Sequence, residues 1–173
     1  FAFQIFERPL VAMLPMFADQ VLHIGAEGLG ALRAAPAIGA VLTALVFALR
    51  PMKVISARRL LFVVAGFGVC MIGFGLSQYF WLSMIFLAIS GAFDSVSMII
   101  RGTLMQLLTP EAMKGRVSAV NSMFIISSNE IGAFESGVAA KLLGLVPSIV
   151  FGGIATLSVV AAAARSKSFR QMT

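Results

Sequence analysis

The sequence predicts an all-α membrane protein. Of its 173 residues, 60% are apolar and 12% are charged, and the mean hydropathy is +1.00. Soluble domains average roughly half apolar and a quarter charged residues, and a globule of this length has too little interior to bury the excess. Six apolar stretches are long enough to cross a bilayer, which takes about 20 residues each as a helix. This composition excludes a soluble enzyme, a disordered tail and, with the single Cys70, a disulfide-stabilised secreted domain.

The first three expected helices are separated by basic residues and proline. The first covers residues 2–22 and is interrupted by Glu7-Arg8-Pro9. The second covers residues 30–49 and ends before Pro51, because the residue before a proline disfavours helix. The third covers residues 60–77 and follows a pair of arginines.

The last three expected helices follow the same rules. Residues 80–107 form the fourth, which ends before Pro110, and residues 117–140 form the fifth. The sixth covers residues 147–164 and opens with proline, a favourable first-turn residue. An outer-membrane barrel would show alternating strands of about ten residues instead. Small-residue stretches, 65–68 and 152–153, predict sites where membrane helices approach closely.

The basic residues predict the orientation. Nine of the 13 Lys and Arg lie in the loops 50–59 and 108–116 and in the tail after residue 164. Six spans place these three regions on one side, and positive charge marks the cytoplasmic side, so both ends of this chain are expected to be cytoplasmic. This clustering explains the net charge of +6 without a nucleic-acid partner. The nine are Arg50, Lys53, Arg58, Arg59, Lys114, Arg116, Arg165, Lys167 and Arg170.

The fourth helix carries its polar residues on one face. A charged side chain at bilayer depth costs about 2.5–3.5 kcal/mol on insertion scales and is a functional candidate. Asp94 lies halfway along the span, and Arg101 is two turns closer to the cytoplasm. The stripe predicts a face turned to an aqueous cavity; the alternative is an internal Asp94–Arg101 pair that only fixes packing. Intervals of 7, 4, 3 and 4 residues align Ser83, Ser90, Asp94, Ser97 and Arg101.

The fifth helix carries two glutamates. Asn121, Ser128 and Glu135 share one face, whereas Glu130, next to Asn129, points nearly the opposite way. The short loop makes the fourth and fifth helices antiparallel, which allows Glu130 to approach the aspartate of the fourth helix. Carboxylates at membrane depth serve proton relays. Which of the two glutamates faces the cavity stays open.

The first helix also carries charges, whereas the third and sixth carry none within the spans. Glu7 and Arg8 are adjacent and point to different faces, so at least one is expected to contact another helix or the cavity. Asp19 and His23 lie near the outer end, where an interfacial position is expected and a gate is the alternative. We therefore expect the third and sixth helices to face lipid.

The sequence shows no residue pattern typical of a catalytic site. The single histidine lies near the membrane surface, and no cluster of His, Cys and carboxylates has metal-ligand spacing. No glycine-rich phosphate loop is present. We expect no cofactor, no metal and no enzymatic activity.

Two motifs carry a family resemblance. Residues 108–121, LTPEAMKGRVSAVN, match the loop between the tenth and eleventh helices of a transporter family, with Lys114 where arginine is usual. Residues 127–137, SSNEIGAFESG, are similar to its eleventh helix, although relatives often carry glutamate where this chain has Ala133. Residues 32–40 and 91–94 fit its eighth and tenth helices. The chain resembles the C-terminal six-helix half of a major facilitator superfamily transporter, and more narrowly the branch of transmembrane secretion effectors and enterobactin-exporter-like proteins.

The resemblance implies a fold of two inverted three-helix repeats, residues 1–77 and 80–164. The first, second, fourth and fifth helices would line a cavity, and the third and sixth would support them from outside. The N-terminal six-helix half would be missing from this chain and would complete the site for a small-molecule substrate. The two basic loops would form the cytoplasmic gate with Arg58, Arg59, Lys114 and Arg116.

The expected function is secondary active transport in a bacterial inner membrane, exporting small amphipathic molecules such as drugs or siderophores. Proton coupling would use Asp94, Glu130 and Glu135, with Arg101 binding an anionic group or adjusting the aspartate. The alternatives are a non-transporting scaffold or assembly subunit and an inactive truncated half. Further polar residues expected to line the cavity are Ser90, Ser97, Asn121, Ser128 and Asn129.

Overall fold

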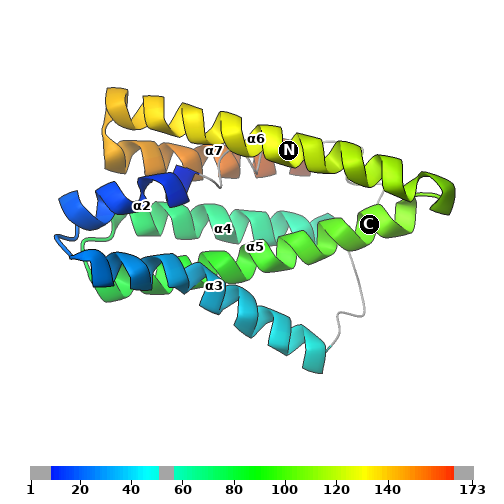
Figure 1. The fold of residues 1–173 in the computed structure, drawn as a ribbon, viewed down its shortest axis with the longest axis horizontal. Helices are drawn as coiled ribbons and strands as arrows, with labels where there is room; N and C mark the ends of the chain where they lie inside the picture. The colour runs from blue at the N-terminus through cyan, green and yellow to red at the C-terminus, as the bar shows by residue number, and fades with distance from the viewer. Residues whose placement is uncertain (1–8, 51–56, 166–173) are drawn as a thin grey trace.

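A computed structural model describes residues 9–50 and 57–165, and the described residues form helices and turns without strands (Figure 1). One short 3-10 helix, η1, connects the two longest helices. The elements are α2 (Pro9–Gln20), α3 (Ala26–Leu49), α4 (Ala57–Leu76), α5 (Phe80–Leu108), η1 (Glu111–Met113), α6 (Lys114–Leu143) and α7 (Leu145–Arg165).

Four of the described helices are long and apolar enough to cross a membrane, which confirms the expected all-helical membrane class. They are Ala26–Leu49, Arg59–Leu76, Phe80–Leu108 and Leu145–Arg165. The described part of α2 has 12 residues, and the preceding expected residues 2–8 lie outside the described ranges. The helix α6 has 30 residues but is not among the four. Six spanning helices therefore stay a prediction.

Successive helices run in opposite directions, which gathers the basic residues at one end (Figure 1). There α3, α5 and α7 end and α4 and α6 begin; we call this the basic end. The short connections 21–25, 77–79 and Gly144 lie at the opposite end. Gly144 ends α6 with a φ of 90°, which suits glycine because it has no Cβ. Exposed at the basic end are Arg50, Arg59, Lys114, Arg116 and Arg165.

The helix α5 packs between α3 and α4, and the approach to α3 is made by small residues. A Cβ added to Gly39 would collide with the carbonyl oxygen of Ala88, and one added to Gly91 would collide with the backbone of Pro36. Small residues let membrane helices come this close. Any side chain at either glycine would push α3 and α5 apart.

The helix α4 also packs against α7, at two of the expected small-residue stretches. A Cβ added to Gly68 would lie 3.2 Å from the carbonyl oxygen of Gly153, and one added to Gly153 would lie 3.0 Å from that of Gly68. These stretches are sites of close helix approach, as predicted. The remaining long helix, α6, packs against α2 and α7.

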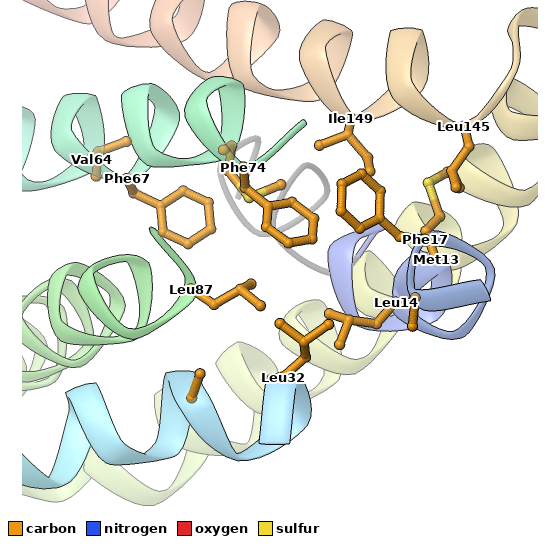
Figure 2. Packing of buried hydrophobic residues seen from close by; sticks show 13 residues of the cluster. Met13, Leu14, Phe17, Leu32, Val64, Phe67, Phe74, Leu87, Leu145 and Ile149 are labelled. Carbon is orange, nitrogen blue, oxygen red and sulfur yellow. The ribbon is translucent and has the colours of Figure 1, made fainter. Parts of the chain in front are cut away.

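Thirteen buried apolar residues form one cluster (Figure 2), and most of them lie in the halves of their helices away from the basic end. Phe17 of α2 lies against Phe74 of α4, with ring centroids 4.4 Å apart. Leu32, Leu87 and Ile149 add the starts of α3, α5 and α7 to this cluster. Toward the basic end, the second half of α3 diverges from α5 (Figure 1). Aromatic and aliphatic contacts therefore hold the bundle together at the end away from the basic residues.

Candidate functional site

The polar stripe of α5 faces inward. Gly91 approaches α3 and Phe93 lies over Gly66 of α4, and at 100° per residue the stripe falls between these two contacts. The side chains of Ser83, Ser90 and Ser97 are 0–3% exposed. The stripe is therefore enclosed by the neighbouring helices along most of its length, as its spacing predicts for one shared face.

Asp94 and Arg101 form an ion pair along this stripe. Arg101 Nη2 lies 3.8 Å from Asp94 Oδ1, and Arg101 Nε donates a hydrogen bond to the carbonyl oxygen of Ser97 at 3.3 Å. The side chains of Arg101 and Asp94 remain 31% and 21% exposed, so the pair is neither sealed in the interior nor fully solvated. The internal pair considered as the alternative is thus present, and its partial exposure leaves the guanidinium within reach of a small anion.

The serines of the stripe differ in their partners. Ser90 Oγ donates to the carbonyl oxygen of Leu87 at 2.8 Å, so its own helix satisfies it. Ser83 Oγ donates to Ser77 Oγ at 3.0 Å and ties α5 to the end of α4. Ser97 Oγ is buried without a hydrogen-bond partner among the described residues. The expected contact of Ser90 and Ser97 with a cavity stays a prediction.

The polar residues of α6 are mostly exposed. Glu130, Glu135 and Asn121 are exposed and Asn129 is partly exposed. Ser128 is buried, and its Oγ donates to the carbonyl oxygen of Phe124 at 2.6 Å. Both glutamates therefore remain candidates for an aqueous face.

The structure does not bring Glu130 to Asp94. The closely packed helix pairs include α5 with α3 and α4, and α6 with α2 and α7, but not α5 with α6. An antiparallel arrangement from a short loop was expected to allow the approach. The two helices separate because each takes its packing partners from elsewhere in the chain (Figure 1).

The residues expected at the gate lie at the basic end. Lys114 Nζ lies 3.3 Å from Glu111 Oε1, a surface pair one turn apart, and Arg59 and Arg116 are exposed. The side chain of Arg58 lies outside the described residues, as do Glu7 and Arg8.

The other end of the bundle holds the remaining candidates. Asp19 is exposed at the end of α2, consistent with a position near the surface. His23 has a φ of 51° in the connection to α3, a turn that the sequence did not signal. Among the described residues, no three His, Cys, Asp or Glu side chains are grouped to hold a metal ion.

Comparisons with known proteins decide the family. The family model described as transmembrane secretion effector matches residues 1–172. The chain belongs to this family. As a member of this family it is a multi-pass membrane protein of the major facilitator superfamily.

One curated relative adds to this. The chain is 29% identical over 137 residues to the enterobactin exporter EntS of Citrobacter koseri. The match covers 79% of this chain and 33% of that exporter, so the chain spans about a third of the length of the curated relative. No solved structure was found to match the chain.

Proposed function

We propose that this chain is part of a secondary active transporter of the bacterial inner membrane that exports small amphipathic molecules by alternating access. The observation that carries the proposal is the partly exposed Asp94–Arg101 pair on the enclosed stripe of α5. Charged groups at membrane depth are expensive, so they are rare and commonly mark substrate pathways or proton relays. Family membership and the exporter relative support the direction of transport.

Within this proposal Asp94 exchanges a proton with the aqueous phase and Arg101 binds an anionic group of the substrate. An aspartate that loses its charge releases the guanidinium 3.8 Å away for another anion. Glu130 and Glu135 on the exposed surface of α6 carry protons separately from Asp94, because α5 and α6 are not packed against each other. Catecholate siderophores and amphipathic drugs are the proposed substrate classes.

The proposed 3+3 inverted repeat receives support from the packing. Exchange of the repeats maps α2 to α5, α3 to α6 and α4 to α7. It turns the packed pairs α3–α5 and α4–α5 into α6–α2 and α7–α2, which are also packed, and it maps α4–α7 onto itself. The correspondence is incomplete, because α2–α3 and α6–α7 are closely packed pairs whereas their images, α5–α6 and α3–α4, are not. Gly68 and Gly153 contact each other reciprocally, as residues near a two-fold axis do.

The proposed partner is an N-terminal six-helix half in the same transporter. Glu130 and Asn121 lie on the surface of α6 together with Met123 and Phe134, which are 69% and 76% exposed. Lipid suits the apolar members of such a surface but not the polar ones. A second half that encloses a water-filled cavity satisfies both.

The test is proton-gradient-dependent efflux of lipophilic dyes and catecholate siderophores from cells that express the complete open reading frame. We expect Asp94→Asn, Glu130→Gln and Glu135→Gln each to abolish gradient-driven efflux without loss of membrane insertion. Asp19→Asn makes the same chemical change at the exposed end of α2 and is expected to retain efflux. Unchanged efflux in all three carboxylate variants would contradict the proton coupling.

Arg101→Ala tests the substrate role separately. We expect weaker binding of anionic substrates, because no other basic side chain shares the stripe. Normal affinity and a normal pH profile in this variant would remove the role assigned to Arg101.

A non-transporting scaffold is the second candidate, since the Asp94–Arg101 pair also fits a role confined to packing. Absence of efflux from an inserted, complete protein would favour it, or an inactive truncated half.

A further inference from the structure

A crevice opens between α3 and α5 where the two helices separate. At Gly39 the two helices are too close for a Cβ to fit, and α3 diverges from α5 toward the basic end (Figure 1). The crevice has a volume of about 300 Å³. Its α3 wall consists of Gly39, Leu42, Thr43 and Val46, and its α5 wall is formed by residues around Ile89.

The lining of the crevice is apolar and has no free hydrogen-bonding side chain. Its single hydroxyl, Thr43 Oγ1, donates to the carbonyl oxygen of Gly39 at 2.9 Å. Ala92 lines the crevice and precedes Asp94 by two residues, which is about 200° around the helix. The crevice therefore lies on the side of α5 opposite the polar stripe, in two helices long and apolar enough to span the membrane.

The α3 wall leads to a basic residue. Gly39, Thr43, Val46 and Arg50 follow at intervals of 4, 3 and 4 residues and so share one helix face. Arg50 caps α3, with its backbone N–H bonded to the carbonyl oxygen of Val46 at 2.8 Å, and it is exposed. At 1.5 Å per residue, Arg50 lies about 16 Å from Gly39 along the axis. Half of the hydrocarbon thickness of a bilayer is about 15 Å, so the helix face from Gly39 to Arg50 is about as long as one leaflet is thick.

We propose that this crevice binds an anionic phospholipid, with an acyl chain between α3 and α5 and the phosphate at Arg50. Charge complementarity selects the headgroup. The basic end exposes five cationic residues and, among the described acidic residues, only Glu111. The lining of the crevice is apolar and its one hydroxyl is already hydrogen-bonded, so it suits a lipid acyl chain. This assignment does not depend on the proposed transport activity.

Native mass spectrometry of the complete, delipidated protein tests the proposal. The probes are phosphatidylglycerol and phosphatidylcholine with identical acyl chains. We expect phosphatidylglycerol to bind about fivefold more tightly, the effect of one basic residue near an anionic headgroup. Arg50→Gln is expected to remove this preference. Equal binding of the two lipids to the unmodified protein would overturn the assigned headgroup.

The acyl-chain site is tested by filling the crevice. Val46→Trp places a large side chain in it, and Leu45→Trp is the matched control because Leu45 is 56% exposed and does not line the crevice. We expect Val46→Trp to lose the phosphatidylglycerol that Leu45→Trp retains. Equal retention in both variants would overturn the site. So would cross-linking of Val46→Cys to a helix upstream of this chain, because that helix would then occupy the crevice.

Discussion

Consecutive helices α5 and α6 have nearly the same length, 29 and 30 residues, and both carry carboxylates within the apolar region. The helix α5 lies between α3 and α4 and buries three of its serines. The helix α6 contacts α2 and α7 and leaves Asn121, Glu130 and Glu135 exposed. Two helices of similar length thus have opposite surroundings.

The two helices differ in where their polar groups find hydrogen-bond and ion-pair partners. On α5 they are found within the bundle, through the Asp94–Arg101 pair and the bond from Ser83 to Ser77. On α6 the exposed glutamates need water or another protein surface, since lipid offers no hydrogen bonds. The polar groups of α5 thus bond mainly within this chain, whereas those exposed on α6 suit the proposed second half.

The largest expected difference between α5 and α6 is in the effect on stability of replacing a glycine with alanine. Gly91→Ala on α5 is expected to lower the free energy of unfolding by about 1–3 kcal/mol, because the added Cβ collides with the backbone of Pro36. Gly137→Ala on α6 meets open space and is expected to stabilise by up to about 1 kcal/mol through helix propensity. Thermal unfolding in detergent measures both. Equal effects would show that α5 is no more tightly packed than α6.

Cysteine labelling tests exposure directly. In a Cys70→Ala background, Glu130→Cys is expected to react with a water-soluble maleimide many times faster than Ser97→Cys, since Ser97 is 0% exposed. Glu135→Cys, measured alongside, shows which glutamate position faces water. An unreactive cysteine at both glutamate positions would mean that lipid covers α6 and would contradict an aqueous face.

The smallest expected effect is the coupling within the ion pair of α5. Asp94→Asn and Arg101→Gln are each expected to destabilise the protein, and the double variant to lose less than the sum by about 1 kcal/mol. Chemical unfolding of the four proteins measures this. Strict additivity would mean that the pair contributes nothing to stability, so the charges would be retained for another reason.

Much of the fold could be predicted locally. The expected range 80–107 agrees closely with Phe80–Leu108 in the structure. Tyr79, in an extended conformation, precedes this helix, and Pro110 follows it closely. The helix α6 extends beyond the expected 117–140 to Lys114–Leu143, because charged residues at both ends are compatible with helix outside the bilayer core. Hydropathy detects the membrane-buried part of a helix, not its full length.

The candidate site could be predicted only within one helix. The shared face of Asp94, Ser97 and Arg101 follows from helical periodicity alone, and the structure places all three on it. The distance between Asp94 and Glu130 depends on how α5 and α6 pack, and the expected approach is not found.

The amino-acid sequence alone predicts the membrane environment, the helical class, the family and the polar stripe of α5. These depend on hydropathy, periodicity and contiguous motifs, which are local. The tertiary structure decided that α5 pairs with α3 and α4 rather than with α6, and that Gly39 and Gly91 rather than other glycines make the closest crossing. Such choices depend on which surfaces fit together across distant segments, because apolar membrane helices gain from close packing and not from hydrophobicity alone.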